Sequence, residues 1–153
     1  MLITVVIAGH KKSRRAAYLR LLQAEKGIKV IGEARNSLEA IAASVRLKPN
    51  ILLIESDLSK ENGIALLPVL RRISPETKAI LLMRDGAETR LLKALSFGVR
   101  GYIEEALIAT FLVKAVRLVS AGEVWVPRGM TVKIVSYLAH LTASSQISSG
   151  GLT

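Results

Sequence analysis

Short apolar segments alternate with longer stretches of helical periodicity from the first residue to about residue 121. The apolar segments, rich in Val, Ile and Leu, predict strands at residues 2–8, 29–34, 51–54, 79–83 and 101–103. The stretches between them carry apolar residues every three or four positions and predict helices at 13–25, 37–47, 63–73, 87–97 and 106–121. This alternation predicts an α/β fold in which a doubly wound, five-stranded parallel sheet is covered by helices on both faces.

Residues with strong local preferences support several of these boundaries. Asn36 or Ser37 is suited to cap the second predicted helix. Lys48 is expected to end that helix because it precedes Pro49, and the residue before proline disfavours the α conformation. Pro68 is discordant, since it falls inside the third predicted helix and must either occupy the first turns or produce a kink.

The alternation stops after Gly122. Residues 123–128 predict a short extended segment, and Met130, Ile134, Leu138 and Leu141 mark one face of an additional C-terminal helix of about three turns. A Ser/Gly-rich linker is predicted from Thr142 onward. We therefore expect a folded domain at residues 1–122, followed at 123–153 by a linker helix and a Ser/Gly-rich tail.

Composition narrows the class of protein. The 153 residues fit one domain, half of them are hydrophobic, and the absence of cysteine excludes disulfides and thiolate metal sites. No apolar run approaches the length of a membrane span, and the apolar start of the chain lacks the basic leader of a signal peptide, so a soluble cytoplasmic protein is expected. A net charge of +10 suggests an anionic partner such as nucleic acid.

Several segments resemble the receiver domain of two-component response regulators, in the sub-group whose output domain is a LuxR-type helix-turn-helix. The resemblance lies in the first, second, third and fifth predicted strands and the end of the fifth helix, at residues 5–10, 29–34, 49–55, 98–103 and 120–125. It implies the flavodoxin-like receiver fold. It also implies a signalling module of transcription regulation rather than an enzyme, with DNA bound by a C-terminal helix-turn-helix domain that would begin near Leu152.

Receivers of this family accept a phosphoryl group from a histidine kinase on an aspartate, with Mg²⁺ held by carboxylates. The resemblance places other residues at all of these positions: Gly9 and His10 at the acidic pair, Glu55 at the phosphoacceptor, Met83 at the hydroxyl and Glu105 at the lysine. Mg²⁺ needs several oxygen ligands, and this set lacks them. The sequence therefore predicts a pseudo-receiver that works without phosphorylation, metal or cofactor.

Two alternatives remain open at this stage. Asp57, two residues beyond the acceptor position, or Glu55 itself would be the acceptor in a working phosphoreceiver. In the other alternative, the helix entrance at His10, Lys11 and Lys12, with Arg84, binds an anionic metabolite. The same cations, Lys11, Lys12 or Arg84, are also candidates to pair internally with Glu55 and imitate the charge of a phosphoaspartate.

Three further expectations concern surfaces. The basic cluster of Lys11, Lys12, Arg14, Arg15 and Arg20 is interpreted mainly as a solvated helix face. Tyr102 matches the switch aromatic of receivers and is expected to be fixed by packing. A homodimer is expected, through the fourth and fifth helices with the fifth strand or through the first and fifth helices, and the DNA contact is assigned to the output domain rather than to this segment.

Overall fold

The computed structural model describes residues 1–56, 58, 63–84, 88–127 and 130–150. Its strands are β1 (Ile3–Ala8), β2 (Ile28–Ala34), β3 (Ile51–Glu55), β4 (Lys78–Met83) and β5 (Gly101–Glu104). Its α-helices are α1 (Lys12–Gln23), α2 (Ser37–Leu47), α3 (Leu66–Ile73), α4 (Glu88–Ser96), α5 (Ile108–Ser120) and α6 (Thr131–Gly150). Short 3₁₀ turns at Gly63–Ala65 and Glu105–Leu107 lead into α3 and α5.

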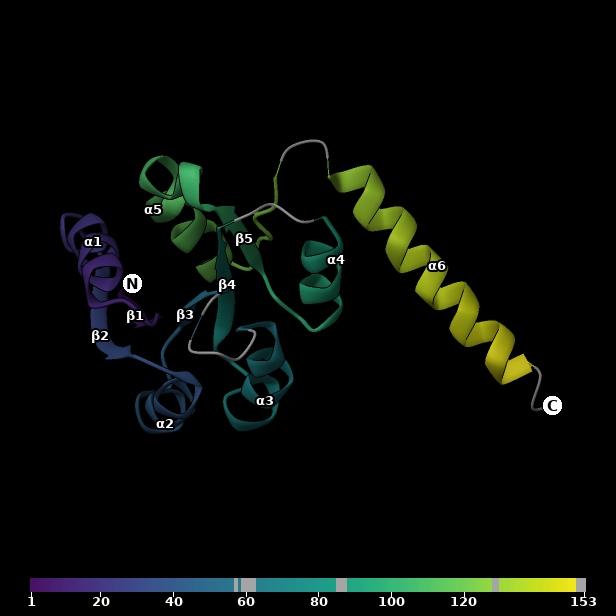
Figure 1. Ribbon diagram of the computed structural model, residues 1–153, viewed down its shortest axis with the longest axis horizontal. Helices are drawn as coiled ribbons and strands as arrows, with labels where there is room; N and C mark the ends of the chain where they lie inside the picture. Colours follow the sequence, from purple (N-terminus) through teal and green to yellow (C-terminus); the bar gives the residue numbers. More distant parts are fainter. Residues whose placement is uncertain (57, 59–62, 85–87, 128–129, 151–153) are drawn as a thin grey trace.

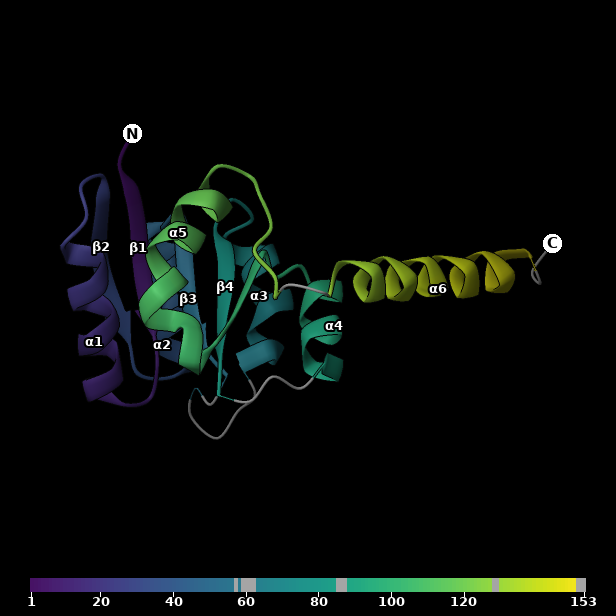
Figure 2. The same ribbon diagram turned by 90° about the horizontal axis from the view of Figure 1, so that it is seen from above.

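The five strands form one parallel sheet in the order β2-β1-β3-β4-β5. Helices α1 and α5 pack on one face, and α2, α3 and α4 pack on the other (Figures 1 and 2). The winding reverses between β1 and β3, so the loops that follow these two strands meet at the carboxyl edge of the sheet. The predicted doubly wound fold is confirmed.

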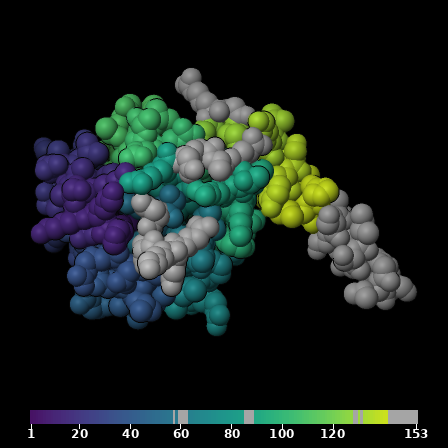
Figure 3. Space-filling model, in the orientation of Figure 1, coloured from purple at the N-terminus to yellow at the C-terminus, as the bar shows by residue number. Residues whose placement is uncertain are grey.

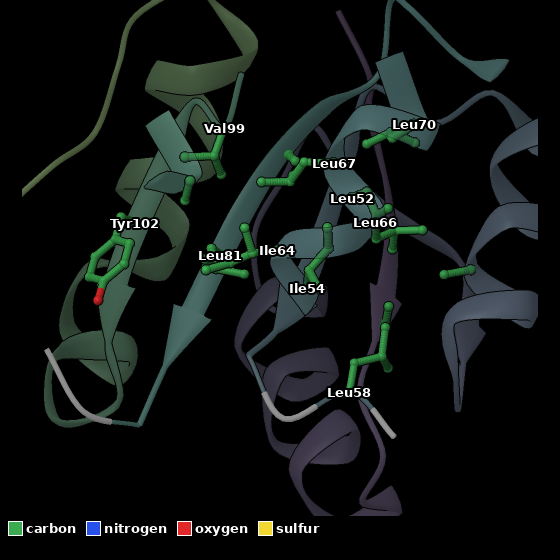
Figure 4. Close-up of a cluster of buried hydrophobic side chains, with 14 of the residues drawn as sticks. Leu52, Ile54, Leu58, Ile64, Leu66, Leu67, Leu70, Leu81, Val99 and Tyr102 are labelled. Atoms are coloured by element: carbon green, nitrogen blue, oxygen red, sulfur yellow. The ribbon is translucent and has the colours of Figure 1, made fainter. Parts of the chain in front are cut away.

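The sheet is buried because its central strands are apolar throughout. All five residues of β3 are buried, and Leu52, Ile54 and Leu81 interlock with side chains of α3 in the cluster shown in Figure 4. Strands covered on both faces require such continuous apolar runs. Pro68 lies in the first turn of α3, where its missing N–H has no intrahelical partner to lose, so the helix is not kinked there.

The C-terminal helix differs from its prediction. The predicted helix of about three turns is followed by a linker from Thr142, but α6 continues to Gly150 and spans 20 residues. The linker prediction was therefore wrong over 142–150. Serine and alanine are tolerated in helices, and this segment contains neither proline nor glycine before Gly150, so nothing in it stops the helix.

The segment between α5 and α6 closes the edge of the sheet. The backbone N–H of Tyr102 donates to the carbonyl of Trp125 at 2.9 Å, and the N–H of Trp125 donates to the carbonyl of Arg100 at 2.9 Å. Helix α6 then begins beside α4 and extends away from the sheet (Figures 1 and 2). Within the described part of the chain, no helix has the length and apolarity needed to span a membrane.

Candidate functional site

Glu55, the last residue of β3, is a charged side chain inside the carboxyl edge of the sheet. Only 2% of its surface is exposed. Its Oε1 accepts a hydrogen bond of 2.7 Å from the hydroxyl of Tyr18, and its Oε2 lies 3.9 Å from Nη1 of Arg14. Both partners come from α1 and are four residues apart, so they share one face of that helix.

Arg14 joins this buried carboxylate to a second acid. Its Nη2 donates a hydrogen bond of 2.9 Å to Oε1 of Glu105, which stands at the start of the turn after β5. The exposed fractions of the Arg14 and Glu105 side chains are 22% and 47%, so their pair lies at the rim of the site. One guanidinium therefore bridges the ends of β3 and β5.

Gly9 makes the space that Glu55 occupies. A Cβ at this position would lie 3.2 Å from Cδ of Glu55 and 3.3 Å from both its Cγ and its Oε2. Any larger residue at position 9 would press on the carboxylate, and an acidic one would also repel it. The glycine and the glutamate therefore fit each other sterically.

Neighbouring side chains of the protein occupy most of the space around the Glu55 carboxylate. Met83 is buried, and it lines the cavity together with Arg14, Tyr18, Arg84 and Glu105. In the described part of the chain, these side chains leave almost no free volume in that cavity. Among the described residues, no group of three His, Asp or Glu side chains is placed to hold a metal ion. The donor set does not fit Mg²⁺, because positions 9 and 10 supply no carboxylate and Glu55 already faces Tyr18 and Arg14.

Tyr18 is held in its protonated form. Burial and the hydrogen bond to Glu55 raise the pKa of this phenol above its usual range. A tyrosine that donates to a carboxylate supplies a neutral hydrogen bond, while Arg14 supplies the positive charge. The Glu55 carboxylate is therefore stabilised by a donor and a cation that both belong to the protein.

The structure adds a partner of Glu55 to those predicted. Lys11 and Lys12 are exposed, whereas Arg14, which was not among the predicted partners, lies 3.9 Å from the carboxylate. Arg84, the third candidate, lines the same cavity. The sequence signal for the partners of Glu55 is the pair Arg14 and Tyr18, which are four residues apart on α1.

The basic cluster of α1 is also less exposed than predicted. Arg15 is only 6% exposed, pairs with Glu33 at 3.0 Å, and donates to the carbonyl of Gly9 at 2.7 Å and to that of His10 at 3.3 Å. It fixes the turn between β1 and α1. The His10 side chain points to solvent.

Tyr102 is buried, as the expectation of a packed aromatic requires. It is 2% exposed and lies in the same apolar cluster as Val99 (Figure 4). Val126 and Met130, which follow the segment that pairs with β5, pack against this cluster. Asp57, the alternative acceptor, lies outside the described residues.

The comparisons with known proteins agree with this architecture. The chain is 27% identical over 135 residues to the transcriptional regulatory protein LnrK of Bacillus subtilis, covering 88% of the chain and 61% of LnrK. It is 28% identical over 123 residues to the response regulator protein VraR of Staphylococcus aureus, covering 80% of the chain and 59% of VraR. The chain thus spans about three fifths of these relatives.

Solved structures show the same fold. A two-component response regulator of the LuxR family from Aurantimonas superposes with a TM-score of 0.82 at 20% identity, covering 91% of this chain and 99% of that one. The receiver domain of a NarL-type regulator from Mycobacterium tuberculosis gives 0.76 at 21% identity, covering 80% and 98%. The profile of the response regulator receiver domain matches residues 5–117. The chain therefore belongs to the response regulator receiver domain family.

Proposed function

We propose that this chain is a pseudo-receiver: a regulatory and dimerisation module, at residues 1–122, of a transcription regulator whose state does not depend on phosphorylation. The observation that carries the proposal is the buried Glu55 carboxylate, held by Tyr18 and Arg14 against Gly9. At the position where the family carries its acceptor, the negative charge is built in and already neutralised.

Three features support this assignment. A phosphoryl donor must reach the acceptor oxygens, but Glu55 is almost fully buried and the described residues leave almost no free volume beside it. Magnesium requires additional acidic oxygens, which Gly9 and His10 do not supply. At position 105 the family's lysine is replaced by a glutamate, and Arg14 restores a positive charge from another helix.

Beryllofluoride with Mg²⁺, which mimics a phosphoryl group on a receiver, tests this proposal. We expect the amide NMR spectrum of the chain to stay unchanged on addition. Saturable shifts at Gly9, Glu55 and Met83 would contradict it. A parallel titration of the Asp57→Ala variant decides whether any such shift comes from the alternative acceptor.

The proposed output is DNA binding through a helix-turn-helix domain beyond this segment, as the LuxR-family resemblance implies. One solved relative carries the description of a DNA-binding response regulator of the LuxR family, from Staphylococcus aureus. Paired half-sites favour a two-fold dimer. Because the 123–127 segment pairs with β5 and α6 lies beside α4, we favour the α1 and α5 surface for dimer contact over the α4, β5 and α5 surface. Substitutions on the two surfaces, followed by sedimentation, distinguish them.

A further inference from the structure

A groove lies at the edge of the sheet opposite Glu55. Its volume is about 750 Å³. It is bordered by the start of β4 at Lys78, by the loop before β5 at Val99 and Arg100, and by Ile134 and Leu138 of α6. In the space-filling view of Figure 3, the first part of α6, in yellow, lies beside the teal and green surface that includes α4. The groove is therefore formed jointly by the receiver fold and its C-terminal helix.

The walls of this groove are partly apolar and its charges are mainly positive. Leu95, Val124, Ile134 and Leu138 contribute apolar surface, while Val99 is only 2% exposed. Arg71, Lys78 and Arg100 contribute three cations, against one acid, Glu76. Within the described part of the chain, neither the Arg71 nor the Arg100 guanidinium has an ion-pair or side-chain hydrogen-bond partner, whereas Lys78 donates weakly to the carbonyl of Ser120 at 3.4 Å.

Gly98 leaves room for the stem of one of these cations, Arg71. Gly98 has φ of +96°, and a Cβ there would come within 3.0 Å of Cδ of Arg71. The stem of Arg71 thus lies across the glycine, beside the loop that carries Arg100. Thr77 also lines the groove, and its hydroxyl donates a hydrogen bond of 2.7 Å to the carbonyl of Pro49.

We propose that this groove binds a small amphipathic anion, an apolar chain or ring that carries a carboxylate. The volume is within the usual range of small-molecule sites. The two guanidiniums without partners are complementary to a carboxylate, which arginine binds in a two-pronged geometry. The apolar part would lie against Leu95, Val124 and Ile134, so the bound ligand would join α6 to the rest of the fold. This inference does not depend on the state of Glu55.

Octanoate, its neutral analogue octanamide, and acetate test the proposal by NMR titration of the whole chain. We expect saturable shifts from octanoate at residues 95–100, 134 and 138, and binding about tenfold weaker for octanamide because the charge-assisted hydrogen bonds are lost. Acetate is expected to cause no saturation at the same concentrations. Octanoate is also expected to raise the heteronuclear NOE of residues 132–141, since it bridges α6 and the sheet.

A matched pair of variants completes the test. Arg71→Gln with Arg100→Gln is expected to weaken octanoate binding about tenfold. Arg20→Gln with Arg46→Gln, which removes two exposed arginines on α1 and α2, leaves it unchanged. Equal binding of octanoate and octanamide, no saturation, or unchanged binding to the first double variant would overturn the proposal. Shifts that follow protein concentration rather than octanoate would instead assign the groove to a second copy, and also overturn it.

Discussion

The two edges of the sheet differ in the pairing of their charged side chains and in the free volume beside them. At the carboxyl edge, Glu55 is paired by Tyr18 and Arg14, and the cavity beside it is filled. At the opposite edge, Arg71 and Arg100 border an open groove of about 750 Å³. Receivers bind their phosphoryl group at the carboxyl edge, where the Glu55 side chain here is paired with Tyr18 and Arg14. This difference leads us to propose a ligand at the other edge.

The largest expected effect comes from putting an acid back at position 9. Gly9→Asp places a second carboxylate against Glu55 and is expected to lower the free energy of unfolding by about 3 kcal/mol, from steric overlap and like-charge repulsion. Urea denaturation measures it. In the Glu55→Asp background, where the side chain is one methylene shorter, the same substitution is expected to cost about 1 kcal/mol. Equal costs in both backgrounds would show that Gly9 and Glu55 are not coupled.

The next effect is the loss of the phenol. Tyr18→Phe leaves the buried Glu55 without its hydrogen bond, so the free energy of unfolding is expected to fall by about 2 kcal/mol. Tyr137→Phe, on the partly exposed α6, serves as the control and is expected to change it by less than about 0.5 kcal/mol. Similar losses in both variants would contradict the assigned role of Tyr18.

The same hydrogen bond predicts a pH dependence. The folded-state pKa of Tyr18 is raised above the unfolded value of about 10, so its stabilising contribution is complete below pH 10. Above that pH the unfolded phenol loses its proton first, and the contribution declines. The difference in free energy of unfolding between the wild type and Tyr18→Phe is therefore expected to be constant from pH 7 to 9 and to shrink above about pH 10. A difference that grows with alkaline pH would be inconsistent with a raised pKa.

Removal of the bridging cation is expected to cost less. Arg14→Met leaves Glu55 with Tyr18 but removes a charge that is 3.9 Å away and 22% exposed, so we expect a loss of about 1 kcal/mol in the free energy of unfolding. Glu105→Gln, which affects only the rim pair, is expected to cost about 0.5 kcal/mol or less. The order of the two losses, measured by urea denaturation at low and high salt, tests whether Glu55 is the main partner of Arg14.

The smallest effect is expected at the open edge. Leu138→Ser changes a side chain that is 45% exposed on α6 and is expected to alter the free energy of unfolding by less than about 0.5 kcal/mol. The same variant is expected to weaken octanoate binding. A large loss of stability would mean that Leu138 belongs to the core rather than to a ligand groove.

Most of the fold could be predicted because hydrophobic periodicity changes at each element boundary. The end of each predicted strand agrees with the structure to within one residue, and α2 agrees at both ends. The tail could not be predicted in this way, because its Ser-rich composition is typical of a linker although residues 142–149 contain neither proline nor glycine. The positions of glycine and proline therefore predict the end of this helix better than the overall Ser content does.

The candidate site could be predicted only in part. The resemblance located Gly9, Glu55, Met83 and Glu105, and the structure gathers Glu55, Met83 and Glu105 around one cavity with Gly9 against the carboxylate. The approach of Arg14 to Glu55 was not predicted, because Lys11 and Lys12 are nearer to the turn in sequence. Helix geometry decides between them: Arg14 and Tyr18 face the sheet, and the two lysines precede that face.

Intact mass spectrometry after incubation with acetyl phosphate and Mg²⁺ tests the central claim most directly, that the carboxyl edge is closed to phosphorylation. We expect no phosphoryl adduct on the chain, while a receiver that carries the aspartate and both acids becomes modified under the same conditions. An adduct on the wild-type chain that disappears in Glu55→Ala or Asp57→Ala would contradict the claim and identify the acceptor.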